Sequence, residues 1–204
     1  MYHGERFNSY SHLAGLLLAV GGSAWLIAQA ALRGDAWQVV SVSIFAASMV
    51  LLYGASTLYH SVKGAAKRVL VKFDHCAIYV LIAGTYTPFT LVTLRGPWGW
   101  ALFGTVWGLA LVGIVKELWL GRERVPSVPL YVAMGWMGIV AVVPLVRELP
   151  GAGLAWLVAG GLLYTIGIVF YANDERWKHA HGVWHLFVLG GTASHYCAVL
   201  LYVA

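Results

Sequence analysis

Charged residues are scarce in this sequence. Only 10% of its 204 residues are Asp, Glu, Lys or Arg, whereas soluble domains average about 25%. This shortage excludes a disordered chain and an ordinary water-soluble globule. The 2 cysteines are too few for the disulfide framework of a small secreted domain. Apolar side chains are abundant instead: 60% of the residues are hydrophobic and the mean hydropathy is +0.76, which is typical of a polytopic membrane protein.

The few charges divide the chain into long uncharged runs. A helix needs about 20 mostly apolar residues to cross the hydrocarbon core of a bilayer, and seven runs reach that length. They are residues 7–32, 36–62, 75–94, 96–115, 125–146, 149–173 and 179–204. A β-barrel does not fit, because its strands would alternate apolar and polar residues. We therefore predict an all-α membrane protein, a single seven-transmembrane domain over residues 1–204 with helices near 8–32, 37–62, 74–94, 97–119, 125–146, 150–173 and 180–203.

The distribution of lysine and arginine predicts the orientation of this bundle. Ten of the 13 such residues fall on the side of the N-terminal tail and the second, fourth and sixth connectors. They are Arg6, Lys63, Lys67, Arg68, Lys72, Lys116, Arg122, Arg124, Arg176 and Lys178. The positive-inside rule then predicts a cytoplasmic N-terminus and an outside C-terminus. The net charge of +5 suits anionic lipid headgroups of the inner leaflet and requires no nucleic acid.

Small residues, proline and cysteine add expectations about packing. The 24 glycines favour close helix contacts, as in the stretch from Gly104 to Gly108. Pro88 lies inside the third run and predicts a kink. Cys76 and Cys197 are expected far apart along the bundle, which excludes a disulfide between them.

Polar residues inside the runs are few and gather at helix ends. Such residues are costly in a bilayer and usually functional. The four clusters are Glu5, Asn8 and His12 in the first run; Ser56 and His60 in the second; Asp74 and His75 in the third; and His179, His181 and His185 in the seventh. Because successive helices alternate in direction, all four clusters are expected at one depth, near the cytoplasmic face.

The spacing of the histidines indicates a metal site. His181 and His185 are four residues apart, so one helical face presents both imidazoles, and His60 supplies a third. Three histidines with an open fourth position are typical of catalytic zinc, which lowers the pKa of bound water to about 7. Asp74 is expected to orient that water or accept its proton, and Ser56 to bind the water or a developing oxyanion.

Each of these residues also has a simpler interpretation when it is taken alone. One pair of histidines at this spacing is weak evidence for a metal, and histidines suit the headgroup region. Asp74 alone is typical of a helix cap, and Ser56 alone of an interhelical hydrogen bond. The shared depth of the four clusters favours the metal site over these readings.

Two further groups of polar residues are expected to support the structure. Glu5, Asn8 and His12 share a helical face and form a supporting polar cluster, for which a structural role is favoured. His195 lies ten residues after His185, which places it roughly 15 Å deeper along a helix. That is too deep to share the ion, so we expect His195 to be buried and hydrogen-bonded.

At these positions the sequence resembles the progestin and adiponectin receptor family, and most of all its bacterial hemolysin III-related branch. The resemblance rests on Glu5-x-x-Asn8-x-x-x-His12, Ser56-x-x-x-His60 followed by Asp74, and His181-x-x-x-His185. It implies a Zn²⁺ ion near the cytoplasmic leaflet held by His60, His181 and His185, a water linked to Asp74, and Ser56 close by. The family's receptors resemble alkaline ceramidases and are linked to hydrolysis of lipid amides, and its bacterial members are named for hemolysis and are associated with membrane lipid homeostasis.

Three functions therefore remain open at this stage. The first is a zinc-dependent integral membrane hydrolase of a lipid amide or ester bond, in the bacterial plasma membrane, with lipids of the inner leaflet as partners. The second is a zinc-stabilised receptor or sensor without hydrolytic activity. The third is a pore-forming, hemolysin-like protein. The last is the least favoured, because the polar groups gather at one end of the bundle instead of lining a path across it.

Overall fold

The computed structural model describes residues 4–120 and 127–204, which are almost entirely helical and include no strand. Seven helical spans in this part of the chain are long and apolar enough to cross a membrane, which confirms the predicted fold class. The helices are α1 (Arg6–Arg33), α2 (Ala36–Ser61), α3 (Gly64–Pro88), η1 (Phe89–Thr93), α4 (Pro97–Val115), η2 (Lys116–Leu120), α5 (Val128–Gly135), η3 (Met137–Ala141), α6 (Val142–Glu148), α7 (Gly151–Ala172) and α8 (Ala180–Tyr202). Arg122 and Arg124, which contribute to the predicted orientation, lie outside the described residues.

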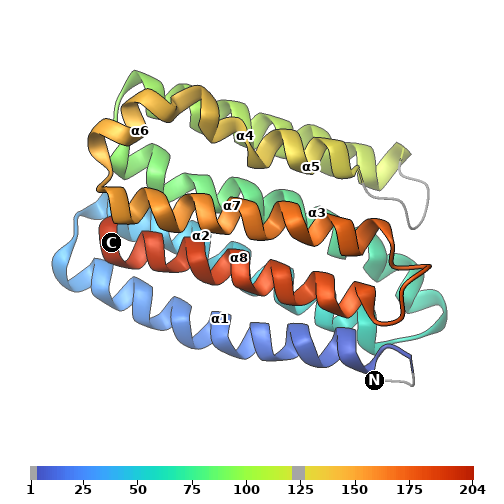
Figure 1. Cartoon of the computed structure of the whole chain (residues 1–204). Coiled ribbons are helices and arrows are strands. Elements are labelled where there is room, and N and C mark those ends of the chain that lie inside the picture. The colour runs from blue at the N-terminus through green and yellow to red at the C-terminus, as the bar shows by residue number, and fades with distance from the viewer. Residues whose placement is uncertain (1–3, 121–126) are drawn as a thin grey trace.

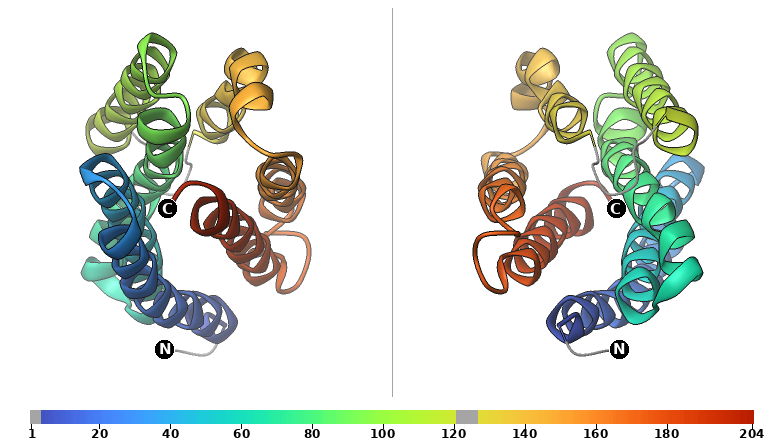
Figure 2. Two further views of the ribbon diagram at one scale, coloured as in Figure 1. Left: turned by 90° about the vertical axis from the view of Figure 1, so that its left-hand side faces the viewer. Right: turned by 90° about the vertical axis from the view of Figure 1, so that its right-hand side faces the viewer.

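The helices lie roughly along one axis, with the start of α1 and the end of α8 at opposite ends of the bundle (Figure 1). α1 packs against α2, α2 against α3 and α3 against α4, while α7 packs against α8 and α8 returns to α1. Viewed end-on, α1 to α4 form one curved wall and α5 to α8 the other (Figure 2). The starts of α1, α3 and α8 and the end of α2 therefore share the N-terminal end of the bundle.

Apolar side chains cover much of the outer surface. Leu17, Leu18 and Trp25 on α1, and Leu111 and Val112 on α4, are all more than half exposed. Such a surface would be unfavourable in water, but it matches lipid chains. The surface and the seven spans together describe a multi-pass membrane protein.

Two spans depart from regular α-helix. α3 gives way to the π-helical turn η1 directly after Pro88, whose ring nitrogen has no hydrogen to donate to the helix. The fifth span is divided at Trp136 into α5, η3 and α6. There the Tyr86 hydroxyl donates to the Gly135 carbonyl (2.7 Å) and accepts from the Gly138 amide (2.8 Å). A side chain of α3 thus satisfies backbone groups that the break would leave unpaired in the membrane.

Glycine allows close contacts at some helix crossings and not at others. A Cβ at Gly84 would collide with the Ser48 side chain on α2, and one at Gly113 would collide with the Tyr79 ring on α3. Nothing in the described chain lies within 4 Å of a Cβ built at Gly104 or at Gly108. The close packing expected at those two positions is therefore wrong for this chain, because that face of α4 points away from the other helices.

Gly99 provides a test of the fold. A Cβ there would overlap the backbone carbonyl oxygens of Thr90 and Leu94, which cannot move aside as a flexible side chain can. We expect Gly99→Ala to destabilise the protein by about 1–3 kcal/mol through overpacking. Gly104→Ala is the matched control on the same helix, and it should leave stability unchanged or raise it, because alanine is the better helix former. Thermal unfolding in detergent measures both, and equal melting temperatures would contradict the packing described here.

Candidate metal centre

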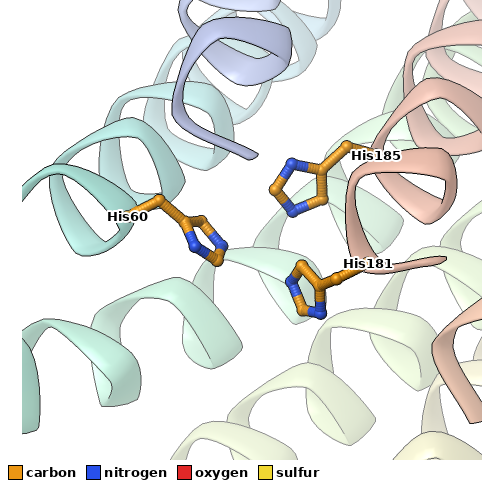
Figure 3. Close-up of side chains that lie close together, drawn as sticks. All are labelled: His60, His181 and His185. Atoms are coloured by element: carbon orange, nitrogen blue, oxygen red, sulfur yellow. The ribbon is translucent and has the colours of Figure 1, made fainter. Parts of the chain in front are cut away.

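His60, His181 and His185 meet at the N-terminal end of the bundle, as expected from the sequence. His60 projects from the last turn of α2, and the other two project from the first turns of α8, with the three rings facing one another (Figure 3). One ring nitrogen from each histidine can be chosen so that all three lie within 4.8 Å of one another. His60 and His185 are buried and His181 is half-buried. This arrangement could hold a metal ion.

Each of the three rings directs its Nδ1 toward a different oxygen. The His60 Nδ1 lies 2.6 Å from Glu5 Oε2, and the His181 Nδ1 lies 2.9 Å from Asp174 Oδ2. The His185 Nδ1 lies 3.2 Å from the Asn8 carbonyl oxygen. Because carboxylate and carbonyl oxygens only accept, each Nδ1 carries the hydrogen and each Nε2 keeps a lone pair. That is the tautomer in which an imidazole binds a metal through Nε2.

The Nε2 of His60 is buried and has no hydrogen-bond partner within residues 4–120 and 127–204. Buried polar atoms are nearly always paired, so a lone pair that points at two other imidazoles fits an ion better than it fits a closed core. Imidazole nitrogen suits zinc, copper, iron and nickel. The residues present therefore fit a transition-metal ion.

Asp74 and Ser56 lie beside the histidines. Ser56 is buried on α2, one turn before His60, and its hydroxyl interacts with the Asp74 carboxyl on α3. Both side chains line the same cavity as the three histidines. Asp74 is not a helix cap, because α3 begins ten residues earlier at Gly64. The capping interpretation is therefore wrong, and Asp74 faces the site from within α3.

The polar cluster of α1 forms part of the surroundings of the histidines. Glu5 contacts both His60 and Lys67, at 2.6 Å in each case, and Asn8 Nδ2 donates to Glu5 Oε2 at 2.8 Å. The ring of His12 stacks on that of His185, with 3.5 Å between ring centroids and 12° between planes. The polar cluster of α1 thus contacts two of the three histidines, His60 and His185.

The environment of Glu5 keeps its carboxyl group charged. Burial alone would raise the pKa of Glu5, but the hydrogen bonds from His60, Lys67 and Asn8 together outweigh burial and hold that pKa well below its usual range. Glu5 therefore presents a negative charge to the site at neutral pH.

Other residues near the site take different roles. The His75 Nδ1 lies 3.6 Å from Glu117 Oε2, and His179 precedes α8 with a left-handed backbone (φ 67°). His195 is hydrogen-bonded through Nε2 to the Leu157 carbonyl at 3.1 Å, as expected for a residue that does not belong to the group of three histidines. Asp174, seven residues before His181, is not predicted from the sequence, because its place in a short charged connector gives no periodic signal.

A cavity of about 1090 Å³ extends from the histidines into the bundle. At the N-terminal end it is lined by His60, Asp74 and His181, among others. Farther in, apolar side chains of both walls line it, including Leu52, Leu81, Ile168 and Val188. A polar site therefore opens into a largely apolar chamber between the two walls of helices.

Within the described chain, Cys76 and Cys197 are both free, which confirms that they form no disulfide.

Comparison with known proteins agrees with this architecture. Residues 1–196 match the family model described as "Haemolysin-III related". The chain is 47% identical to "Hemolysin-3 homolog" of Bacillus subtilis (strain 168), covering 97% of this chain and 93% of the relative. It is 43% identical to "Hemolysin-3" of Bacillus cereus, covering 98% and 91%.

A more distant similarity connects the chain to a receptor protein. It is 22% identical to "Adiponectin receptor protein" of Drosophila melanogaster, over 95% of this chain and 49% of that protein. This agrees with the resemblance drawn from the three polar motifs. The family model matches nearly the whole length of this chain. The chain therefore belongs to the haemolysin-III related family of integral membrane proteins.

Proposed function

We propose that this protein is a zinc-dependent hydrolase of a lipid amide or ester bond, located in a bacterial plasma membrane with its N-terminus in the cytoplasm. The observation that carries the proposal is the convergence of three imidazoles beside Asp74 and Ser56 at the mouth of a largely apolar cavity. A site with three protein nitrogens leaves room for water and substrate, as in catalytic zinc sites, whereas structural zinc sites usually have four protein ligands. The cavity suits a lipid chain.

The chemistry follows from the positions of these residues. His60, His181 and His185 would hold Zn²⁺, which when bound supplies a Lewis acid that polarises a carbonyl oxygen and makes water more acidic. Asp74 accepts the proton of the attacking water and then delivers it to the leaving amine or alkoxide. The Ser56 hydroxyl holds the Asp74 carboxyl in place. The apolar walls bind the acyl chain and exclude bulk water, so the scissile bond stays at the polar end.

A zinc-stabilised receptor or sensor is the second candidate. The observation that favours it is the position of the histidines on α2 and α8, which belong to opposite walls of the bundle. An ion held there would join the two walls whether or not any bond is hydrolysed. In that case Asp74 and Ser56 would be dispensable, while loss of the ion would unfold or loosen the bundle.

Metal content is the first test of the site. We expect the detergent-purified wild type to carry about one zinc ion per chain and His181→Ala to lose it, because two imidazoles remain. His179→Asn is the matched control, since it replaces a neighbouring histidine and asparagine tolerates the left-handed backbone. Elemental analysis of the three proteins measures the ratio. Wild-type protein that contains no transition metal after purification without chelator would contradict the proposal.

Turnover separates the hydrolase from the receptor. Asp74→Asn removes the proton acceptor but no ligand, so we expect metal content to persist and hydrolysis to fall about 10²- to 10⁴-fold. The assay follows release of fatty acid from a panel of lipid amides and esters in reconstituted vesicles. If Asp74→Asn and His60→Ala both leave turnover and cellular lipid profiles unchanged, the enzyme claim fails.

Chelation tests the second candidate directly. If zinc acts mainly in catalysis, a chelator should abolish turnover while the melting temperature falls only by the contribution of ligand binding to the native state. A receptor with structural zinc predicts the opposite, a collapse of the thermal transition with no turnover to lose. Differential scanning fluorimetry run beside the lipid assay distinguishes these outcomes.

A further inference from the structure

Two carboxylates outside the membrane spans contact the ring nitrogens that a metal ion would leave unused. Glu5 immediately precedes α1 and meets the Nδ1 of His60 on α2 at 2.6 Å. Asp174 lies in the connector between α7 and α8 and meets the Nδ1 of His181 at 2.9 Å. The two carboxylates thus contact histidines on opposite walls of the bundle, each from a segment that contributes no ligand.

The third histidine, His185, contacts a different kind of oxygen through its Nδ1. The Nδ1 of His185 lies 3.2 Å from the backbone carbonyl of Asn8 and 3.1 Å from the Ser11 hydroxyl. The Ser11 hydroxyl itself donates to the Asn8 carbonyl at 2.9 Å, so it can accept from His185. This ring is therefore held by neutral groups, and the negative charge is supplied only to His60 and His181 among the three rings.

The two carboxylates are not held equally firmly. Glu5 Oε1 accepts from Lys67 on α3, and Glu5 Oε2 accepts from the amide of Asn8 as well as facing His60. Its side chain is 22% exposed. Asp174 is 30% exposed and belongs to a short turn of the connector. Glu5 is thus fixed from α1, α2 and α3 at once, whereas Asp174 is held by a more solvent-accessible contact.

We propose that Glu5 and Asp174 are positioning residues of the metal centre and set its affinity for a divalent cation. This inference rests on the proposed zinc site. A carboxylate that accepts the Nδ1 hydrogen fixes the tautomer and rotation of the ring and makes Nε2 a stronger donor. The two negative charges also offset the double positive charge of the ion in surroundings of low polarity. Glu5 contributes more than Asp174, because it is more firmly held and less screened by water.

Zinc affinity measured on the whole protein tests this inference. Metal-stripped wild type, Glu5→Gln, Asp174→Asn and the double variant are titrated with Zn²⁺ against a chromophoric chelator. We expect Glu5→Gln to raise the zinc Kd about 10- to 100-fold and Asp174→Asn to raise it less. The double variant should bind zinc more weakly than either single variant, because each carboxylate acts on a different ring. Asp35→Asn, a carboxylate in the α1–α2 turn at the other end of the bundle, should leave the Kd unchanged.

Two additional measurements separate positioning from a loss of fold. Lys67→Met breaks the ion pair with Glu5 but keeps the carboxylate against His60, so it should move the zinc Kd far less than Glu5→Gln. Cobalt substituted for zinc should show a shifted visible absorption spectrum in Glu5→Gln and an unshifted one in Asp35→Asn. Equal zinc Kd values for wild type, Glu5→Gln and Asp174→Asn would overturn the inference while leaving the zinc site intact. A loss of zinc affinity in Lys67→Met as large as that in Glu5→Gln would overturn it as well. Absence of zinc binding in the wild type overturns the proposed function itself.

Discussion

Hydrocarbon offers no hydrogen-bond partners, and this constraint explains how polar groups are arranged along the chain. A polar atom that is unpaired in a bilayer costs several kcal/mol, so the backbone is helical wherever it crosses. Where a helix must break, as at Trp136, a hydroxyl from a neighbouring helix takes over the exposed backbone groups. At the site, the Nδ1 atoms of the three histidines obey the same constraint, since each of them faces an oxygen.

The same constraint explains why the site lies at one end of the bundle. Two of its carboxylates, Glu5 and Asp174, lie just outside the spans and contact imidazole rings that belong to α2 and α8. The imidazoles, which are neutral when they bind a metal, occupy the deeper positions. Beyond them the cavity is largely apolar. This gradient from charge to hydrocarbon is the reason that we propose an amphiphilic ligand, with its polar bond at the histidines and its chain within the bundle.

Membership of the haemolysin-III related family and the geometry of the site support different parts of the account. The family match and the close Bacillus relatives establish the kind of protein and its membrane setting. The names of these relatives describe lysis, and that of the distant relative describes a receptor, so neither specifies chemistry. The chemical proposal comes from the donor set: three nitrogens, a carboxyl and a hydroxyl around an open position are suited to activating water.

The sequence by itself determined the class of fold and predicted that His60, His181 and His185 lie close together. Charge scarcity alone predicts seven spans, because a charge inside hydrocarbon is so costly that each uncharged run of sufficient length becomes a helix. Alternating helix direction then places Ser56, His60, Asp74 and the α8 histidines at one depth. The ends of the helices are harder to predict from the sequence. Lys67, Arg68 and Lys72 lie within α3, because long basic side chains can extend to the membrane interface without ending a helix.

Only the tertiary structure decided which groups contact each histidine. Periodicity places residues on a helical face, but it does not state which face meets a neighbouring helix. For that reason Gly104 and Gly108 were expected at a contact that the described chain does not make, and Asp174 was overlooked although it meets His181. The pairings of Glu5 with His60 and of Asn8 with His185 join segments far apart in the chain. Such contacts depend on the rotation and separation of packed helices, which arise from all side chains together and from no single motif.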